Sequence, residues 1–108
     1  MMSAEVLDRL FEVIESRKGA DADSSYTAKL FAKGRPKIAQ KVGEEGVETV
    51  IAALAETPED VINESADLLY HLLVLWADCD VKPEDVWAVL QKREGISGIA
   101  EKASRTKE

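Results

Sequence analysis

The sequence predicts an all-α protein whose four principal helices form a bundle-like protomer. Apolar residues recur at spacings of three and four through most of the chain, and no segment alternates apolar and polar residues for long enough to predict a strand. Helix-starting and helix-ending residues leave only short connections, which favours a bundle. The 108 residues are expected to form one domain over residues 1–95, followed by a polar, flexible tail over residues 96–108.

The first expected helix is capped by Ser3 and ended by Gly19. Its apolar stripe has the 3.6-residue period of an amphipathic helix and consists of Val6, Leu7, Leu10, Phe11, Val13 and Ile14. Residues 18–25 read as a loop. Residues 25–33 then predict a short helical segment, which Gly34 stops.

Two long helices and a shorter one are expected in the second half of the domain. Pro36 suits the first turn of a helix that runs to about Glu56. Thr57 as an N-cap, followed by Pro58 and two acids, predicts that the next helix begins at Pro58, and it should end near Asp78. The last helix is expected from residue 83 to residue 95.

Composition and charge exclude several classes of protein. The net charge of −7 argues against binding to nucleic acids or to anionic membranes. No stretch approaches the roughly 18 apolar residues of a membrane span, and the N-terminus lacks the pattern of a signal peptide. The single cysteine, Cys79, allows no internal disulfide. We therefore expect a cytoplasmic protein.

Two acidic pairs lie on the two long helices at i, i+3 spacing, which places both members of a pair on one face. The pairs are Glu45 with Glu48, and Glu64 with Asp67. Glu48 precedes Thr57 by nine residues and Glu64 follows it by seven, so an antiparallel hairpin brings the pairs to nearly the same height. Four converging carboxylates without cysteine ligands predict a site for Mg²⁺ or Mn²⁺ rather than Zn²⁺.

The helix over residues 58–78 is apolar nearly all round and is expected to be largely buried. A narrow polar stripe runs along it, and His71 lies on this stripe one turn after Asp67. We interpret His71 as a hydrogen-bond partner or a core histidine rather than a metal ligand. The alternative to a metal site is a salt-bridged bundle core in which Lys41 pairs with Glu45 at i+4.

The segment from Ser24 to Gly43 contains no acidic residue but has five basic ones: Lys29, Lys33, Arg35, Lys37 and Lys41. Basic side chains beside a carboxylate cluster are what a polyphosphate bound through Mg²⁺ requires. Tyr26 adds a ring that can stack on a base or sugar. The alternative is an ordinary basic surface loop. No glycine-rich phosphate loop of the Walker type is present.

These motifs resemble a known family. "SYTAKLFAKGRPKIAQKVGEEGVETVIAAL" and "NESADLLYHLLVLW" are similar to the phosphoribosyl-ATP pyrophosphatases of histidine biosynthesis and, more widely, to the all-α nucleoside triphosphate pyrophosphohydrolase (MazG-like) superfamily. The shared signature is E-E-x-x-E on one helix, here Glu44, Glu45 and Glu48, and E-x-x-D on the next. The resemblance covers about residues 3–95.

The resemblance implies a Mg²⁺-dependent homodimer that releases pyrophosphate from phosphoribosyl-ATP. From the paired carboxylates next to an acid-free basic segment, we expect Glu44, Glu45 and Glu48 to be catalytic, with Glu44 orienting or deprotonating water or helping to hold a second metal. The expected metal ligands are Glu45, Glu48, Glu64 and Asp67. The expected substrate-binding residues are Tyr26, Lys29, Lys33, Arg35 and Lys41.

Two other interpretations stay open on the sequence alone. One is a house-cleaning hydrolase of aberrant nucleoside triphosphates, because the acidic motifs are common to the superfamily. The other is a non-catalytic helical dimerisation module. Gly43 and Gly46 lie on the face of their helix opposite the acids, so we expect them to admit a packed helix rather than a ligand.

Overall fold

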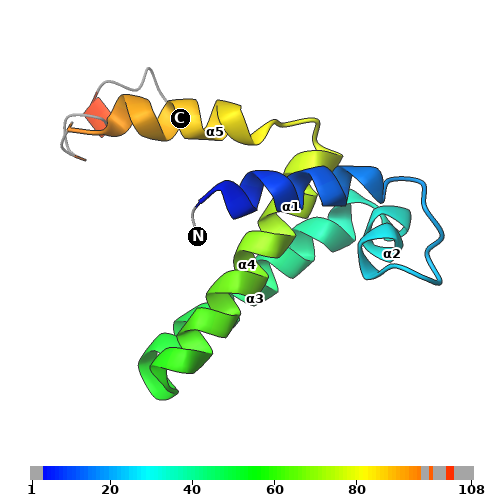
Figure 1. Cartoon of the computed structure of the whole chain (residues 1–108). Coiled ribbons are helices and arrows are strands. Elements are labelled where there is room, and N and C mark those ends of the chain that lie inside the picture. The colour runs from blue at the N-terminus through cyan, green and yellow to red at the C-terminus, as the bar shows by residue number, and fades with distance from the viewer. Residues whose placement is uncertain (1–3, 96–97, 99–101, 104–108) are drawn as a thin grey trace.

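The computed structural model describes residues 4–95, 98 and 102–103, and the regular secondary structure of these residues is helical (Figure 1). Over these residues there is no strand, which confirms the all-α class. The helices are α1 (Glu5–Ser16), α2 (Tyr26–Lys33), α3 (Arg35–Ala55), α4 (Pro58–Asp78) and α5 (Pro83–Arg93). The expected cap Ser3 lies outside the described residues, as does nearly all of the expected tail, 96–108. None of the described helices is both long and apolar enough to cross a membrane.

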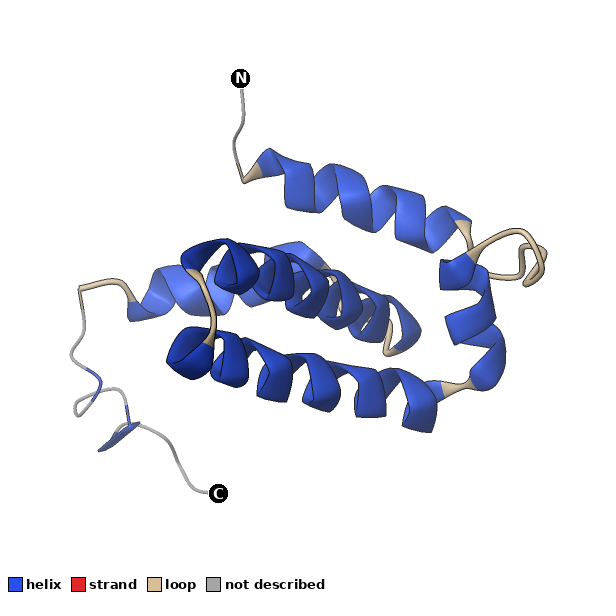
Figure 2. Ribbon diagram, turned by 90° about the horizontal axis from the view of Figure 1, so that it is seen from below, coloured by secondary structure: helices blue, strands red, loops and turns tan. Residues whose placement is uncertain are grey.

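An antiparallel hairpin of two 21-residue helices, α3 and α4, forms the long axis of the protein (Figures 1 and 2). The turn between them is closed by a capping box. The Thr57 hydroxyl accepts a hydrogen bond from the Asp60 amide at 3.2 Å, and the Asp60 carboxylate accepts one from the Thr57 amide at 3.2 Å. The predicted start at Thr57–Pro58 is therefore confirmed.

The short helix α2 connects α1 to the hairpin. The Ser25 side chain caps it by accepting a hydrogen bond from the Ala28 amide at 3.1 Å. Gly34, with φ of 96°, separates α2 from α3 and reverses the chain in a backbone region that favours glycine. The short helical segment predicted over residues 25–33 is thus confirmed.

The hydrophobic core lies at one end of the hairpin, where α1 and α2 cover the start of α3 and the end of α4. Its buried members are Phe11, Ile14, Leu30, Ile38, Leu73, Val74 and Ala77. At the other end, Ile62 is 67% exposed and Leu54 is 83% exposed. The prediction that the helix over residues 58–78 is largely buried is therefore wrong for its first half, because none of the residues that the structure describes covers that part of the hairpin.

The helix α5 extends to one side of the other helices (Figure 1). It is attached through Trp87, whose ring meets that of Trp76 edge to face with centroids 5.7 Å apart. The Trp87 indole also donates a hydrogen bond to the Asp8 carboxylate at 3.3 Å. Over residues 4–95, the helices therefore form an open arrangement around the α3–α4 hairpin rather than a closed four-helix bundle.

Candidate functional site

Three carboxylates converge between the middle of α3 and the middle of α4. They belong to Glu45, Glu48 and Glu64, and one oxygen atom from each lies within 4.8 Å of the others. The two helices are tied together at this height by Thr49, whose hydroxyl oxygen lies 2.8 Å from the Glu45 carbonyl oxygen and 3.3 Å from that of Glu64. The matched heights expected from the spacing around Thr57 therefore place acids of both helices together.

The electrostatics of this cluster fit a divalent cation. Glu45 is only 6% exposed, and one buried carboxylate oxygen each of Glu45 and Glu64 has no hydrogen-bond partner. Burial raises the pKa of Glu45, and the negative charge of Glu48 raises it further. Burial and the Glu48 charge also raise the pKa of Glu64. A cation among these oxygens would satisfy the unpaired atoms and relieve the repulsion, and oxygen-only ligands suit a hard ion.

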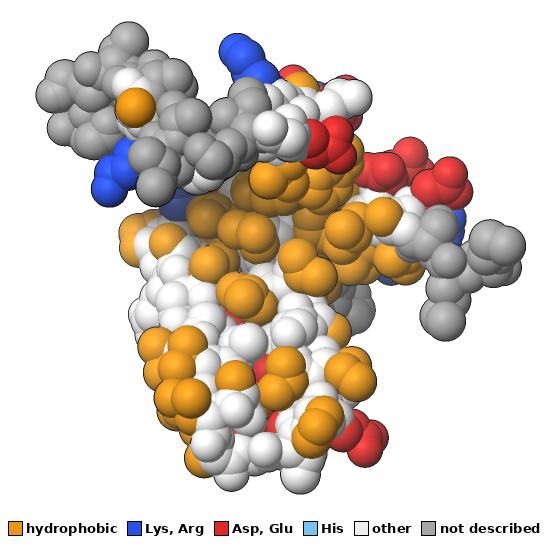
Figure 3. Space-filling view, turned by 90° about the vertical axis from the view of Figure 1, so that its left-hand side faces the viewer, with side chains coloured by type: hydrophobic (Ala, Val, Ile, Leu, Met, Phe, Trp, Pro, Cys, Tyr) orange, Lys and Arg blue, Asp and Glu red, His pale blue; other side chains and the backbone are white. Residues whose placement is uncertain are grey.

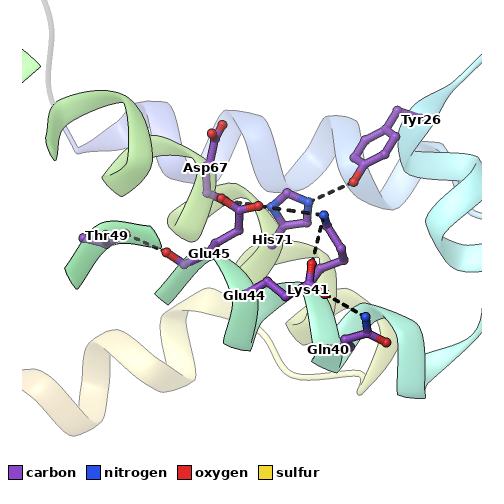
Figure 4. A network of polar contacts seen from close by, with 8 residues as sticks. All are labelled: Tyr26, Gln40, Lys41, Glu44, Glu45, Thr49, Asp67 and His71. Carbon is purple, nitrogen blue, oxygen red and sulfur yellow. Dashed lines mark hydrogen bonds and ion pairs between the residues drawn. The ribbon is translucent and has the colours of Figure 1, made fainter. Parts of the chain in front are cut away.

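Asp67, the fourth predicted ligand, does not join the cluster. Its side chain is exposed and points away from the Glu45 carboxylate (Figure 4). Its charge still contributes to raising the pKa of Glu45, after burial and Glu48, so the two carboxylates are neighbours. The structure thus gathers three of the four expected ligands.

Lys41 and Glu44 form a polar group beside the cluster, on α3 (Figure 4). The Lys41 ammonium lies 3.3 Å from a Glu44 oxygen and 3.9 Å from a Glu45 oxygen, so the alternative Lys41–Glu45 pairing is also present. Gln40 donates a hydrogen bond to Glu44 at 2.7 Å. The bonds from Gln40 and Lys41 lower the pKa of Glu44, which makes it a weaker base than an ordinary glutamate. Its role in activating water stays a prediction.

His71 is buried next to the cluster and takes part in hydrogen bonds. Its Nδ1 lies 2.8 Å from the Asp67 carbonyl oxygen, and its Nε2 lies 3.1 Å from the Tyr26 hydroxyl (Figure 4). The first contact follows from the i, i+4 spacing. The second joins residues 45 positions apart, and no signal in the sequence indicates it. Tyr26 thereby stands at the edge of the carboxylate site.

The remaining predicted substrate-binding residues separate into two groups. Lys29 and Lys33 are exposed on α2 and, at about 100° per residue, share a side of that helix with Tyr26. Arg35 instead joins the start of α3 to the end of α4. Its Nε donates to the Asp78 carboxylate at 2.8 Å and its Nη2 donates to the Asp78 carbonyl oxygen at 2.8 Å. The structure therefore gives Arg35 a partner within the fold.

Comparison with known proteins identifies the family of the chain. Residues 7–94 match the family described as "Phosphoribosyl-ATP pyrophosphohydrolase". The chain is 64% identical over 104 residues to a phosphoribosyl-ATP pyrophosphatase of Paramagnetospirillum magneticum, covering 96% of this chain and 95% of the relative. It is 65% identical over 102 residues to one of Parvibaculum lavamentivorans, covering 94% of each chain. A third, of Azospirillum brasilense, is 61% identical over 104 residues, which cover 96% of this chain and 94% of that relative. The chain therefore belongs to the phosphoribosyl-ATP pyrophosphohydrolase family.

Proposed function

We propose that this protein hydrolyses phosphoribosyl-ATP to phosphoribosyl-AMP and pyrophosphate, the second step of histidine biosynthesis. Membership of the family and the printed names of its relatives support the proposal. The observation that carries it is the cluster of Glu45, Glu48 and Glu64 between two helices, with buried oxygens that lack partners, beside a basic segment free of acids. A carboxylate cluster that can hold a metal, next to basic side chains that can bind phosphate oxygens, suits a metal-bound polyphosphate.

The metal proposed here is Mg²⁺, or Mn²⁺ in its place, held by Glu45, Glu48 and Glu64. We propose Asp67, whose charge contributes to raising the pKa of Glu45, as the fourth carboxylate once its side chain turns toward the cluster. All four ligands are carboxylates, and this donor set favours a hard ion over Zn²⁺. When bound, the ion supplies positive charge that stabilises the phosphates and the leaving pyrophosphate.

The protein's own side chains bind and orient the reactants. Lys29 and Lys33 supply positive charge along one side of α2, and Lys41 supplies it beside the carboxylates, where each can contact phosphate oxygens. Glu44 is the candidate for orienting the attacking water. The water oxygen bonds to the α-phosphorus and gives up a proton, the bond from that phosphorus to the oxygen bridging it to the β-phosphorus breaks, and pyrophosphate leaves with the bond electrons.

This function is tested by measuring pyrophosphate release from phosphoribosyl-ATP in Mg²⁺ and again in excess chelator. We expect release only with Mg²⁺. A panel of ribonucleoside and deoxyribonucleoside triphosphates is assayed in parallel, because a house-cleaning hydrolase would act better on these. Preference for any of them over phosphoribosyl-ATP would contradict the proposed substrate.

We also propose that the protein acts as a homodimer. Exposed apolar side chains follow helical spacing along the part of the hairpin that lies beyond the core, and Figure 3 shows them on the lower part of the molecule. We call this surface the apolar face; it consists of Val47, Val50, Ile51, Leu54, Ile62 and Leu69. A run of exposed apolar residues on two packed helices is typical of a surface covered in an assembly. A second copy of the hairpin would complete a bundle there.

A further inference from the structure

Three aromatic side chains hold the start of α2 against α4. The Tyr26 and Tyr70 rings are stacked with centroids 6.3 Å apart, and the His71 ring meets each of them edge to face, at 5.9 Å and 5.1 Å. The Thr27 and Tyr70 hydroxyls are hydrogen bonded to each other. Tyr26 is therefore fixed in place by packing as well as by its bond to His71, although its side chain is about half exposed.

The partners of His71 determine which of its nitrogens carries the proton. The Asp67 carbonyl oxygen, 2.8 Å from Nδ1, can only accept a hydrogen bond, so Nδ1 carries a hydrogen. A neutral imidazole has one N–H, so Nε2 is then an acceptor. Since Tyr26 lies 3.1 Å from Nε2, its hydroxyl must donate to it. His71 is 6% exposed, so water offers no easy substitute for either partner.

Because the Tyr26 hydroxyl hydrogen points to His71, the Tyr26 oxygen can only accept hydrogen bonds from a ligand in the site. We propose that His71 is a positioning residue that fixes the Tyr26 hydroxyl as a hydrogen-bond acceptor, and that Tyr26 therefore binds a donor group of the nucleoside part of the substrate rather than its phosphates. The inference rests on the proposed function for the presence of a nucleotide in this site. It assigns Tyr26 a chemical preference that stacking alone would not give it.

The chemistry of the ligand follows from the direction of that hydrogen bond. Phosphate oxygens are acceptors, so they gain nothing from an oxygen whose hydrogen points to His71. Ribose hydroxyls and the amino group of adenine are donors and match it. The Lys41 ammonium, the nearby basic group of the site, is directed to Glu44 and Glu45 by its ion pairs at 3.3 Å and 3.9 Å. The Tyr26 oxygen therefore suits donors of the nucleoside, and contacts with phosphate oxygens are left to the basic side chains of the site.

The proton position is tested directly by nitrogen NMR, because the chain contains a single histidine. In protein labelled with ¹⁵N-histidine, at a pH well above the usual imidazole pKa of about 6.5, we expect Nδ1 to be protonated and Nε2 to be bare. Tyr26→Phe should shift the Nε2 resonance, because it removes the donor. The matched control Tyr70→Phe, whose hydroxyl bonds Thr27, should shift it less. A protonated Nε2 with a bare Nδ1 would overturn the inference.

The preference for a nucleoside is tested by calorimetry with two probes, AMP and inorganic tripolyphosphate, both in Mg²⁺. Tyr26→Phe and His71→Phe should each weaken AMP binding about three- to tenfold, the range expected for one neutral hydrogen bond. The double variant should lose no more than Tyr26→Phe alone, and tripolyphosphate should bind all three variants as it binds the wild type.

Three results would count against this inference. Equal losses for both probes, additive losses in the double variant, or no AMP binding to the wild type would each overturn it. If the wild type binds AMP with the expected pattern but releases no pyrophosphate from phosphoribosyl-ATP, the proposed function fails and the inference about Tyr26 and His71 stands. The two failures are therefore distinguishable.

Discussion

At the scale of single residues, the central feature is the cluster of three carboxylates, whose full ionisation costs free energy when no cation is bound. Glu45 and Glu64 have raised pKa values because burial and the Glu48 charge disfavour their ionised forms. A carboxyl with a raised pKa in the folded state stabilises the fold fully below its ordinary pKa, 4.5 for glutamate. That contribution is lost as the pH rises through the raised pKa.

The first prediction follows for Glu45→Gln in metal-free protein. The melting temperature of the variant should exceed that of the wild type at neutral pH. The difference should shrink as the pH falls through the raised pKa of Glu45 toward 4.5, because protonated Glu45 is uncharged like glutamine. Added Mg²⁺ should stabilise the wild type more than the variant. Melting curves in chelator and in Mg²⁺ across this pH range check both effects.

The control for that series is Glu59→Gln, which removes an exposed acid from the first turn of α4. It should leave the difference between chelator and Mg²⁺ as in the wild type. A Glu45→Gln variant that is less stable than the wild type at neutral pH without metal would show that Glu45 is stabilised by its Lys41 pair instead.

The sequence predicts that the carboxylates lie together, because their positions follow from helical spacing and from the turn at Thr57. It does not predict the direction in which each side chain points. Asp67 lies one helical turn after Glu64, yet its side chain points away from the Glu45 carboxylate (Figure 4). A rotamer depends on neighbouring side chains that a spacing pattern does not specify. The Tyr26–His71 hydrogen bond could not be predicted either, because it joins two helices that are far apart in the sequence.

At the scale of elements, the ends of the α3–α4 hairpin are held by different contacts. Thr57 and Asp60 form the capping box at the turn, and Arg35 bonds to Asp78 at the open end. The turn was predictable because a capping residue followed by proline is a local signal. The Arg35–Asp78 contact was not, because it depends on how the two helices meet 43 residues apart.

The second prediction concerns the cap. Thr57→Ala should lower the free energy of unfolding by about 0.5–2 kcal/mol, because it leaves the Asp60 amide without its acceptor. Urea denaturation measures this. Ser24→Ala, in the loop before α2, is the control and should cost less. A loss no larger than that of the control would mean that the box contributes nothing to the turn.

The third prediction separates a structural role for Arg35 from the expected role in substrate binding. If the role of Arg35 is to stabilise the fold through its ion pair with Asp78, Arg35→Gln and Asp78→Asn should lower the melting temperature by similar amounts. The melting temperature of the double variant should then be little lower than that of either single variant. The KM for phosphoribosyl-ATP should stay near the wild-type value in both. A raised KM in Arg35→Gln but not in Asp78→Asn would restore Arg35 to the substrate site.

At the scale of the whole molecule, the uneven distribution of the core is the main feature. One end of the hairpin is covered by α1 and α2, while the other carries the apolar face in the open. The apolar pattern of α4 correctly indicated burial, but no pattern says whether the covering surface belongs to the same chain. For that reason the prediction of a largely buried helix holds in one half and is wrong in the other for a single chain.

The fourth prediction tests the proposed homodimer through Gly46, which lies on α3 next to Val47 of the apolar face. Apart from its chain neighbours and its own helix backbone, a Cβ atom built on Gly46 meets nothing within 4 Å, so a side chain can start there without a clash inside the described protomer. We expect Gly46→Leu to weaken assembly in sedimentation experiments while leaving Mg²⁺ affinity near that of the wild type. Ala32→Leu, exposed on α2, is the control. Reduced Mg²⁺ affinity with unchanged assembly would refute the assignment of one face of α3 to the metal and the opposite face to packing.

The most direct test of the account is pyrophosphate release from phosphoribosyl-ATP by Glu48→Gln at saturating Mg²⁺, beside the wild type and Glu59→Gln. Glu48 supplies one of the three converging carboxylates and raises the pKa of the other two, so it lies at the centre of the proposed metal site. We expect the wild type and Glu59→Gln to release pyrophosphate at similar rates. Glu48→Gln should lose about a hundredfold, because loss of a ligand should cost at least as much as loss of a hydrogen-bond partner of a ligand, which costs about 10–100-fold. Activity of Glu48→Gln equal to that of the wild type would contradict the assignment of this cluster as the metal centre.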